Sequence, residues 1–389
     1  MANILQLCVR YPPAPGGAET HVRSLSQGLK ELGHSVEVYT SDLYKEFPLT
    51  KMKDEDENDI PVKRHGAFTL PGDLHYVFYP SLCASLMKNE FDIYHAHSYG
   101  YFHVNTASFF KNLKNTPFVL TPHYHPRWSM WGGEKREKVR GLYDSLIAQK
   151  VIDSVDRIIG VSRNEISLLS QALDISKEKV RIIPNGISQE EFTPIPDGDR
   201  FRERYDIDGK MVLFTGRLAS NKGLIHLVET MPEVLEDHPD TTFVVVGEDE
   251  GMRDKMLEKA KNLDVKDHLK IIDYIEDYSV FKSSYSAADV FFLPSEYEAF
   301  GIVLLEAMMC ETPCVATRVG GVPEVVSHGE TGYLCEYGDT DSFASHISAL
   351  LDDPKGRKKM GRKGRKRVKK KFTWKKVTRQ VSKVYEELL

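Results

Sequence analysis

The stretch Met211–Gly223 reads MVLFTGRLASNKG and joins an apolar run to a loop that carries two cations and two glycines. Beyond it, apolar residues recur at helical spacing: Leu224, Leu227, Val228, Met231, Val234 and Leu235. A buried strand, a glycine loop and an amphipathic helix are the first parts of a β-α-β unit. We therefore predict that this segment begins an open α/β sheet.

The same alternation of short apolar runs and helical patterns extends in both directions. The strands predicted before it are Ile4–Val9, Val36–Tyr39, Ile93–Ala96, Phe118–Thr121, Arg157–Val161 and Val180–Ile183. Those predicted from it onward are Met211–Thr215, Phe243–Val246, Leu269–Ile272, Val290–Leu293, Cys314–Ala316 and Tyr333–Leu334. The polar stretch Glu190–Asp206 with its two prolines is predicted to be a linker. Two successive α/β domains with parallel sheets follow, whose ligands bind at the carboxyl ends of the strands.

Composition agrees with two globular domains. The chain has 389 residues, of which 41% are hydrophobic and 28% charged. No run approaches the roughly 20 apolar residues of a membrane-spanning helix, and the first residues lack the pattern of a secretory leader. The five cysteines form no CxxC pair, and Cys310 and Cys314 lie in an apolar stretch. We expect free core thiols and a cytoplasmic location.

Charge is unevenly distributed along the chain. Between Lys355 and Lys376 there are 14 Lys/Arg and no acidic residue, so the remainder carries −19 once these cations are subtracted from the net charge of −5. A basic run of this kind is either a solvated helix face or a surface for anionic membranes. Nucleic-acid binding is not expected, because no aromatic residues are interleaved with the cations. Asp54–Asp59 is predicted to be an exposed acidic loop.

Several loops after predicted strands carry residues suited to bind a sugar diphosphate. Gly216-Arg217 and Lys222-Gly223 follow Met211–Thr215 and place a guanidinium and an ammonium where a diphosphate could bind; the alternative is that both cations are merely solvated. Gly16-Gly17 follows the first strand and allows close backbone approach to a ligand, or else forms only a tight turn. The pairs His95/His97 and His123/His125 could each offer two imidazoles to a metal, but no metal site is predicted. His123 is instead predicted to contact substrate, the alternative being a structural hydrogen bond.

The segment Pro294–Ala307, PSEYEAFGIVLLEA, is the most informative. A strand ends near Pro294 and a helix is predicted to begin around Gly301, so the amides of Phe300 to Val303 face an anion. Glu298 lies just before that helix and Glu306 within its apolar run. A buried carboxylate requires hydrogen-bond donors, and sugar hydroxyls supply them. A second glycine turn, Gly320-Gly321, follows another predicted strand.

Together these residues resemble the family 4 retaining glycosyltransferases of the GT-B fold. The motifs that carry the resemblance are Gly16-Gly17-Ala18-Glu19, His123, Asn185-Gly186, Gly216-Arg217 with Lys222-Gly223, Gly247, Glu298-Ala299-Phe300-Gly301 with Glu306, and Gly320–Glu324. They span nearly the whole chain in the family's order. The resemblance implies two Rossmann-like domains whose parallel sheets face each other across a cleft. It also implies that the last helix returns to the first domain, giving boundaries of 1–187 plus 374–389 and 188–373.

The resemblance also implies a role for each matching residue. Arg217 and Lys222 would hold the donor diphosphate. Gly216, Gly16 and the backbone amide of Gly17 would also lie close to the donor. Glu306 would accept hydrogen bonds from the ribose, and Glu298 would orient the transferred sugar. His123 would contact that sugar from the first domain. The remaining donor contacts would come from Gly247, Ile275, Phe300, Gly301, Ile302 and Val303.

One departure from the family pattern stands out. Members often carry Gly-x-Gly after the second strand of the C-terminal domain, whereas this chain has Gly247-Glu248-Asp249-Glu250-Gly251. The three acidic residues disfavour phosphate contact there. The sequences Asp54-Glu55-Asp56 and Asp339-Thr340-Asp341 resemble DxD metal motifs but fall in predicted loops. Neither a metal nor another cofactor is therefore expected.

The expected activity is retaining transfer of a hexose-type sugar from a nucleotide sugar, UDP favoured over GDP. The expected acceptor is lipid-linked, a glycan or another cell-envelope molecule, since the basic run and the Trp-containing segment Arg127–Arg136 suit a peripheral membrane enzyme. Two alternatives remain open: a nucleotide-sugar isomerase or epimerase of the same fold, and a non-catalytic sugar-nucleotide-binding protein. A nicotinamide-dependent enzyme is disfavoured because GxGxxG is absent.

Overall fold

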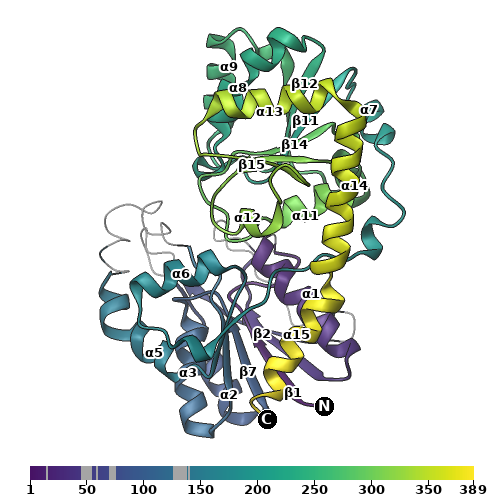
Figure 1. Cartoon of the computed structure of the whole chain (residues 1–389). Coiled ribbons are helices and arrows are strands. Elements are labelled where there is room, and N and C mark those ends of the chain that lie inside the picture. The colour runs from purple at the N-terminus through teal and green to yellow at the C-terminus, as the bar shows by residue number, and fades with distance from the viewer. Residues whose placement is uncertain (15, 45–54, 58–59, 70–75, 126–137, 139–140) are drawn as a thin grey trace. The chain divides into compact units, whose positions relative to one another are not determined.

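The computed structural model describes residues 1–14, 16–44, 55–57, 60–69, 76–125, 138 and 141–389. The chain divides into two compact units, Met1–Gly186 with Trp374–Leu389, and Ile187–Thr373 (Figure 1). We call them the first and the second unit. Arg127–Arg136, singled out for its tryptophans, lies outside the described residues.

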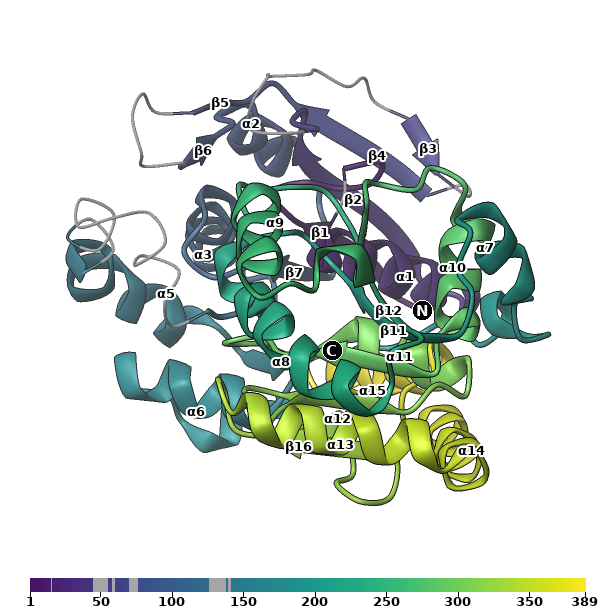
Figure 2. The same ribbon diagram turned by 90° about the horizontal axis from the view of Figure 1, so that it is seen from above.

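The first unit is built on an eight-stranded sheet. Its strands in spatial order are β10 (Val180–Ile182), β9 (Arg157–Gly160), β8 (Phe118–Thr121), β7 (Ile93–His97), β1 (Asn3–Leu7), β2 (Ser35–Ser41), β4 (Ile60–His65) and β3 (Glu55–Glu57). All neighbours pair in parallel except β3, which runs antiparallel to β4 at one edge (Figure 2). The prediction of an acidic loop is therefore wrong for Glu55–Glu57, since β4, a strand not predicted, offers these residues backbone hydrogen-bond partners.

Helices cover both faces of this sheet, and alternation along the strands explains how. Leu5 and Leu7 of β1 point into one buried cluster and Ile4 into another. The first cluster lies under α2 (Ser81–Lys88), α3 (Phe102–Lys114), α5 (Gln149–Ser154) and α6 (Arg163–Ala172). The second lies under α1 (Gly17–Glu31) and α15 (Trp374–Glu386), which pack side by side. In a separate two-stranded sheet, β5 (Phe68–Thr69) pairs antiparallel with β6 (Val77–Phe78).

The second unit contains a six-stranded parallel sheet. Its order is β13 (Leu269–Ile272), β12 (Thr241–Val246), β11 (Lys210–Thr215), β14 (Val290–Leu293), β15 (Cys314–Thr317) and β16 (Gly332–Cys335). Counted in chain order this is 3-2-1-4-5-6, the Rossmann arrangement, which places a topological switch point between β11 and β14. The predicted α/β fold with two Rossmann-like parallel sheets is confirmed.

Eight helices of the second unit, here named with their bounds, surround that sheet (Figures 1 and 2). They are α7 (Asp199–Arg204), α8 (Leu224–Asp237), α9 (Arg253–Asn262), α10 (Tyr278–Ala287), α11 (Ile302–Met309), α12 (Val322–Val325), α13 (Thr340–Asp352) and α14 (Pro354–Lys371). α8 packs on α13, whereas α11 packs on α10 and α14. Two predictions from local composition are wrong here. Phe192 and Phe201 of the expected linker are fully buried, with Phe201 in α7, and Asp339 caps α13 instead of lying in a free loop.

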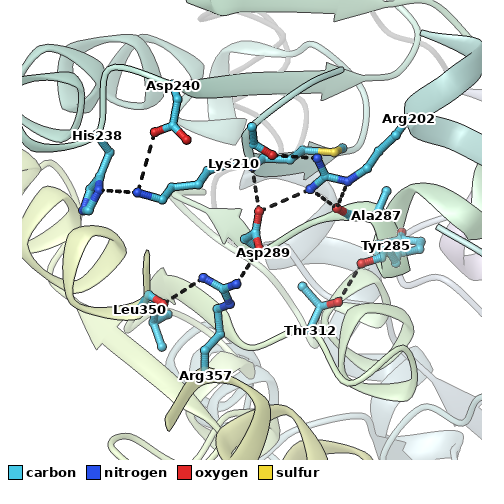
Figure 3. Close-up of polar contacts among 12 residues, drawn as sticks. Arg202, Lys210, His238, Asp240, Tyr285, Ala287, Asp289, Thr312, Leu350 and Arg357 are labelled. Atoms are coloured by element: carbon cyan, nitrogen blue, oxygen red, sulfur yellow. Dashed lines mark hydrogen bonds and ion pairs between the residues drawn. The ribbon is translucent and has the colours of Figure 1, made fainter. Parts of the chain in front are cut away.

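A carboxylate at the start of β14 ties this unit together (Figure 3). Asp289 accepts hydrogen bonds from the Met211 amide at 2.8 Å and from Arg202 of α7 at 3.2 Å. Its other oxygen lies 2.6 Å from the guanidinium of Arg357 in α14. Because all these side chains are at most about one-fifth exposed, the pairs are only weakly screened by solvent. The free cysteines behave as predicted, since Cys310 and Cys314 are buried and unpaired.

Candidate active site

The carboxyl ends of β11, β14 and β15 bring three predicted loops together in the second unit. Lys222 ends the short 3-10 turn η5 (Ser220–Lys222), and its ammonium lies 2.7 Å from the Glu298 carboxylate. The Ser295 hydroxyl donates to the same carboxylate oxygen at 2.9 Å. Both charged side chains are less than one-fifth exposed. A cation and an oriented carboxylate thus lie at the switch point of the sheet, where ligands of such folds bind.

The second glycine turn fixes the backbone beneath that carboxylate. The Gly321 amide donates to the Glu298 carbonyl oxygen at 2.9 Å. Gly320 has a φ of 52°, and a Cβ added there would lie 1.8 Å from the same oxygen. Only glycine combines this backbone conformation with this close approach. The turn therefore fixes the position of the Glu298 backbone.

The helix predicted after Glu298 is α11, and it begins as expected. Gly301 precedes it with a φ of 86°, and Phe300 is buried against Phe372 with 5.7 Å between ring centroids. Ile302 and Val303 form the first turn, where backbone amides have no partner within the helix. These amides and the positive end of the helix dipole are suited to an anionic ligand.

Glu306 lies on the same helix and already has a protein partner. The hydroxyl of Tyr285, on α10, donates to its carboxylate and also lies 2.8 Å from the Thr215 hydroxyl oxygen. Burial raises the pKa of Glu306 to about 7, with the Tyr285 hydrogen bond opposing this effect and Glu191 adding to it. The carboxyl therefore titrates close to neutral pH and keeps one oxygen for a ligand hydroxyl.

Arg217 occupies a different environment from Lys222. Its guanidinium donates to both carboxylate oxygens of Glu250, at 2.7 and 2.9 Å, and is 61% exposed. The acidic departure after Gly247 explains this pair, since the Leu218 amide donates to the Glu248 carbonyl oxygen at 2.8 Å and joins the two loops. Any phosphate that binds Arg217 must compete with Glu250.

Two further predicted residues lie in neighbouring loops of the second unit. Gly247 lies against the Gly216 carbonyl, and Ile275 is buried in the loop after β13.

In the first unit, His123 follows β8 with an unusual backbone conformation. Its φ is 44°, rare for a residue other than glycine. The next amide, that of Tyr124, donates to the buried Glu165 carboxylate at 2.7 Å, which also accepts from the Val161 amide. Burial raises the pKa of Glu165 to about 7, and these backbone hydrogen bonds oppose the shift. Glu165 therefore anchors the loop that presents His123.

Three histidines from separate elements surround this point. His123 packs against His21 of α1 and His97 of β7, with ring centroids 5.0 and 5.8 Å apart. His97 Nε2 donates to the Gln6 side-chain oxygen and His21 Nδ1 to that of Asn185, both at 2.7 Å, so their other nitrogens keep lone pairs. Burial lowers the pKa of His123 well below its usual range and that of His21 to about 4. The cluster is therefore neutral at neutral pH.

One nitrogen from each of these rings lies within 4.8 Å of the others, so the trio could hold a metal ion if the rings closed to the spacing of about 3.4 Å that tetrahedral ligands need. The sequence pairs do not act as ligand pairs. The His95 ring lies 4.2 Å from the His97 ring between centroids, but both of its nitrogens are taken up by Tyr385 and Thr121, at 2.6 and 2.8 Å.

A cavity of about 210 Å³ opens beside the cluster in the first unit. It is lined by the start of α1 and by the loops after β1, β7 and β8, including Arg10, Glu19, His97, Tyr99 and His123. The predicted Gly16-Gly17 pair lies at that start of α1, with Gly17 as its first residue and Arg10 2.9 Å from Glu19. This cavity suits a small polar group that enters next to His123.

Each unit thus gathers its own share of the predicted residues. Lys222, Glu298 and the start of α11 meet in the second unit, and Gly16, Gly17 and His123 in the first. Sequence reasoning missed His21, Glu165, Tyr285 and the Glu250 partner of Arg217. The spacing of residues along the chain gives no signal for Tyr285 or Glu165. His21, in contrast, immediately follows the Gly-Gly-Ala-Glu-Thr segment, so its position next to that motif could have indicated it.

Comparison with known proteins identifies the family of this chain. Residues 15–191 match the model of Glycosyltransferase Family 4, and residues 197–367 match that of Glycosyl transferases group 1. The fold and the loops at its strand ends define a GT-B glycosyltransferase. The chain belongs to the family 4 glycosyltransferases of group 1, as the sequence motifs indicated.

Relatives extend over the whole chain. An uncharacterized glycosyltransferase of Methanocaldococcus jannaschii is 28% identical over 99% of this chain and 98% of its own. The N-acetyl-alpha-D-glucosaminyl L-malate synthase of Bacillus anthracis is 26% identical over 99% and 97%. Among solved structures, Anabaena HepE in complex with UDP has a TM-score of 0.78 at 19% identity, covering 99% of this chain and 100% of its own. The last comparison shows a shared fold.

Proposed function

We propose that this glycosyltransferase transfers a hexose-type sugar from a nucleotide diphosphate sugar, with UDP favoured over GDP, and retains the anomeric configuration without a metal. The observation that carries the proposal is the Lys222–Glu298 pair at the start of α11, with Glu306 further along the same helix. Lys222 and the helix amides would stabilise charge on the departing diphosphate. The UDP bound to Anabaena HepE, a protein of the same fold, supports the choice of UDP.

The remaining groups have roles in the same reaction. Glu306 would accept a hydrogen bond from a ribose hydroxyl, Glu298 would orient the sugar, and His123, neutral and partly buried, would contact that sugar from the first unit. Proton transfer would go from the acceptor hydroxyl to the leaving phosphate on the same face of the sugar. A lipid-linked, glycan or other cell-envelope acceptor is part of the proposal. No helix in the described ranges is both long and apolar enough to cross a membrane.

Thermal unfolding with nucleotides tests the donor site. The parent chain and Glu306→Ala are heated with UDP, GDP, ADP or NAD, each in EDTA. A ligand at 100 times its Kd stabilises by about 2.7 kcal/mol, so one nucleoside diphosphate should raise the Tm of the parent and have little effect on the variant. Stabilisation by NAD alone would exclude the proposal. Loss of UDP binding in EDTA would instead implicate a metal, for which His21, His97 and His123 are the group to test.

Product analysis separates transfer from isomerisation. Incubation with donor alone should release only traces of free sugar, whereas a new nucleotide sugar would identify an isomerase or epimerase. Binding without turnover across acceptors of all three kinds would identify a sugar-nucleotide-binding protein.

A further inference from the structure

The basic run of the sequence becomes helix α14, and its arginines and lysines separate by environment. Arg365 is buried and donates to the Phe192 carbonyl oxygen at 2.9 Å, and Arg367 donates to that of Val325 at 2.7 Å. Arg357 binds the carboxylate that joins α7 to β14 (Figure 3). These three arginines hold the helix on its own unit. Part of the basic run therefore serves to hold α14 in place within the second unit.

The opposite face of α14 carries six exposed cations, which we call the cation ridge: Lys355, Lys358, Lys359, Arg362, Lys363 and Lys366. They line one shallow groove on the surface. Arg362 has a carboxylate, Glu311, at 3.8 Å, but none of the five lysines pairs with a carboxylate of the described chain. At a rise of about 1.5 Å per residue the ridge is about 17 Å long. Six cations are thus displayed along a straight line with at most one neutralised.

We infer that the cation ridge docks the protein on an anionic phospholipid surface. Lysine ammonium groups are compact, hydrated charges that respond to a diffuse negative potential, and five of the six ridge cations are lysines, whereas three of the four arginines of α14 face inward. α14 has no aromatic residue to stack on a nucleobase. The remaining −19 charge of the chain opposes a polyanion that wraps the molecule.

The inference rests on the proposed function only for the biological reason to dock at a membrane. If the acceptor is lipid-linked, docking raises the enzyme's concentration where that acceptor resides. The docking itself requires neither donor nor acceptor, so the two can be tested separately.

Vesicle co-sedimentation at low salt measures the docking. The whole protein is mixed with vesicles of phosphatidylcholine, or of phosphatidylcholine and phosphatidylglycerol in equal parts. The variant Lys358→Gln/Lys359→Gln/Lys363→Gln removes three ridge charges, and Lys255→Gln/Lys261→Gln/Lys266→Gln removes three exposed lysine charges elsewhere in the second unit. We expect the parent to bind only the anionic vesicles. The ridge variant should bind on the order of a hundredfold more weakly, and the control within about twofold of the parent.

Each outcome bears on the inference. Added salt should release the parent, because mobile ions screen exposed charges. The inference is wrong if the parent does not bind anionic vesicles, or if the ridge variant and the control variant lose the same amount of affinity for them. Binding of a single-stranded RNA through the same lysines, without vesicle binding, would assign the ridge to nucleic acid. UDP-induced stabilisation of the ridge variant reports separately on the donor site, so loss of docking with that response intact leaves the proposed function standing.

Discussion

At the scale of single residues, the proposed donor site contains two carboxylates whose partners come from other elements. Glu306 shares a hydrogen bond with Tyr285 of α10, and Glu250 occupies the guanidinium of Arg217. Burial raises the pKa of Glu306 while the Tyr285 hydrogen bond opposes that shift, and the Glu250 pair would compete with a phosphate for Arg217. Both make quantitative predictions about donor binding.

Donor affinity should rise with pH through the ionisation of Glu306. Because burial raises its pKa to about 7, a larger fraction of the carboxyl is ionised at pH 8 than at pH 6, so the Kd for UDP should fall by up to about tenfold over this range. Calorimetric titrations of the parent and Glu306→Gln measure this, since ionisation of the nucleotide itself affects both equally. The same pH profile in both proteins would refute the role.

The same carboxyl should make folding stability depend on pH. Because folding raises the pKa of Glu306, the contribution of this carboxyl to the free energy of unfolding is fully present below pH 4.5 and is lost as the pH rises through about 7. Glu306→Gln should therefore gain stability relative to the parent at pH 8.

Glu250→Gln should strengthen donor binding. The substitution releases Arg217 from its ion pair with Glu250 and removes a negative charge near the proposed phosphate position, so the Kd for UDP should fall roughly three- to tenfold. The control is Glu258→Gln on α9, which removes an exposed charge from the same unit. An unchanged or weaker Kd in Glu250→Gln would mean that Arg217 does not bind the diphosphate.

At the scale of elements, tight turns place the chemical groups that helices and strands support. The turn after β15 supports the backbone of Glu298, as the glycine after η5 supports Lys222 against β14. In the latter, a Cβ on Gly223 would lie 1.9 Å from the Pro294 carbonyl oxygen. These contacts couple the three strand ends into one site.

Gly320→Ala should therefore damage the site more than ordinary backbone strain does. Its Cβ would collide with the Glu298 carbonyl oxygen, so we expect kcat to fall by at least tenfold and the Tm to drop by several degrees. Gly329→Ala is the matched control, because its φ of 74° gives similar strain while a Cβ there meets no atom within 4 Å. Equal losses in the two variants would show that strain alone is responsible.

At the scale of the whole molecule, a few polar contacts bind elements far apart in sequence. Asp289 joins α7, β11 and α14 in the second unit, while Tyr385 of α15 reaches His95 and Gln6 in the first. Chain ends and strand starts are thereby fixed to one another within each unit. Removing one partner leaves the others buried without compensation.

Asp289→Asn should destabilise the second unit by about 1–3 kcal/mol, since two guanidinium groups lose their counter-charge. Urea unfolding measures the loss. Glu336→Gln removes a carboxylate from an exposed pair with Arg318 and should cost less than about 0.5 kcal/mol. Similar midpoints for the two variants would contradict the importance of the Asp289 contacts.

The sequence alone determined the alternation of strands and helices, the glycine turns and the start of α11, because periodicity and φ requirements are local properties. β8, β13 and β14 match their predicted bounds, whereas β4 was missed because Pro61 separates its apolar residues Ile60 and Val62, and the polar residues Lys63, Arg64 and His65 follow them. Only the tertiary structure decided that Tyr285 bonds Glu306 and that Glu250 pairs with Arg217. It also turned three arginines of α14 inward and left the lysines outside. These outcomes depend on which distant elements pack together, and no spacing along the chain encodes that.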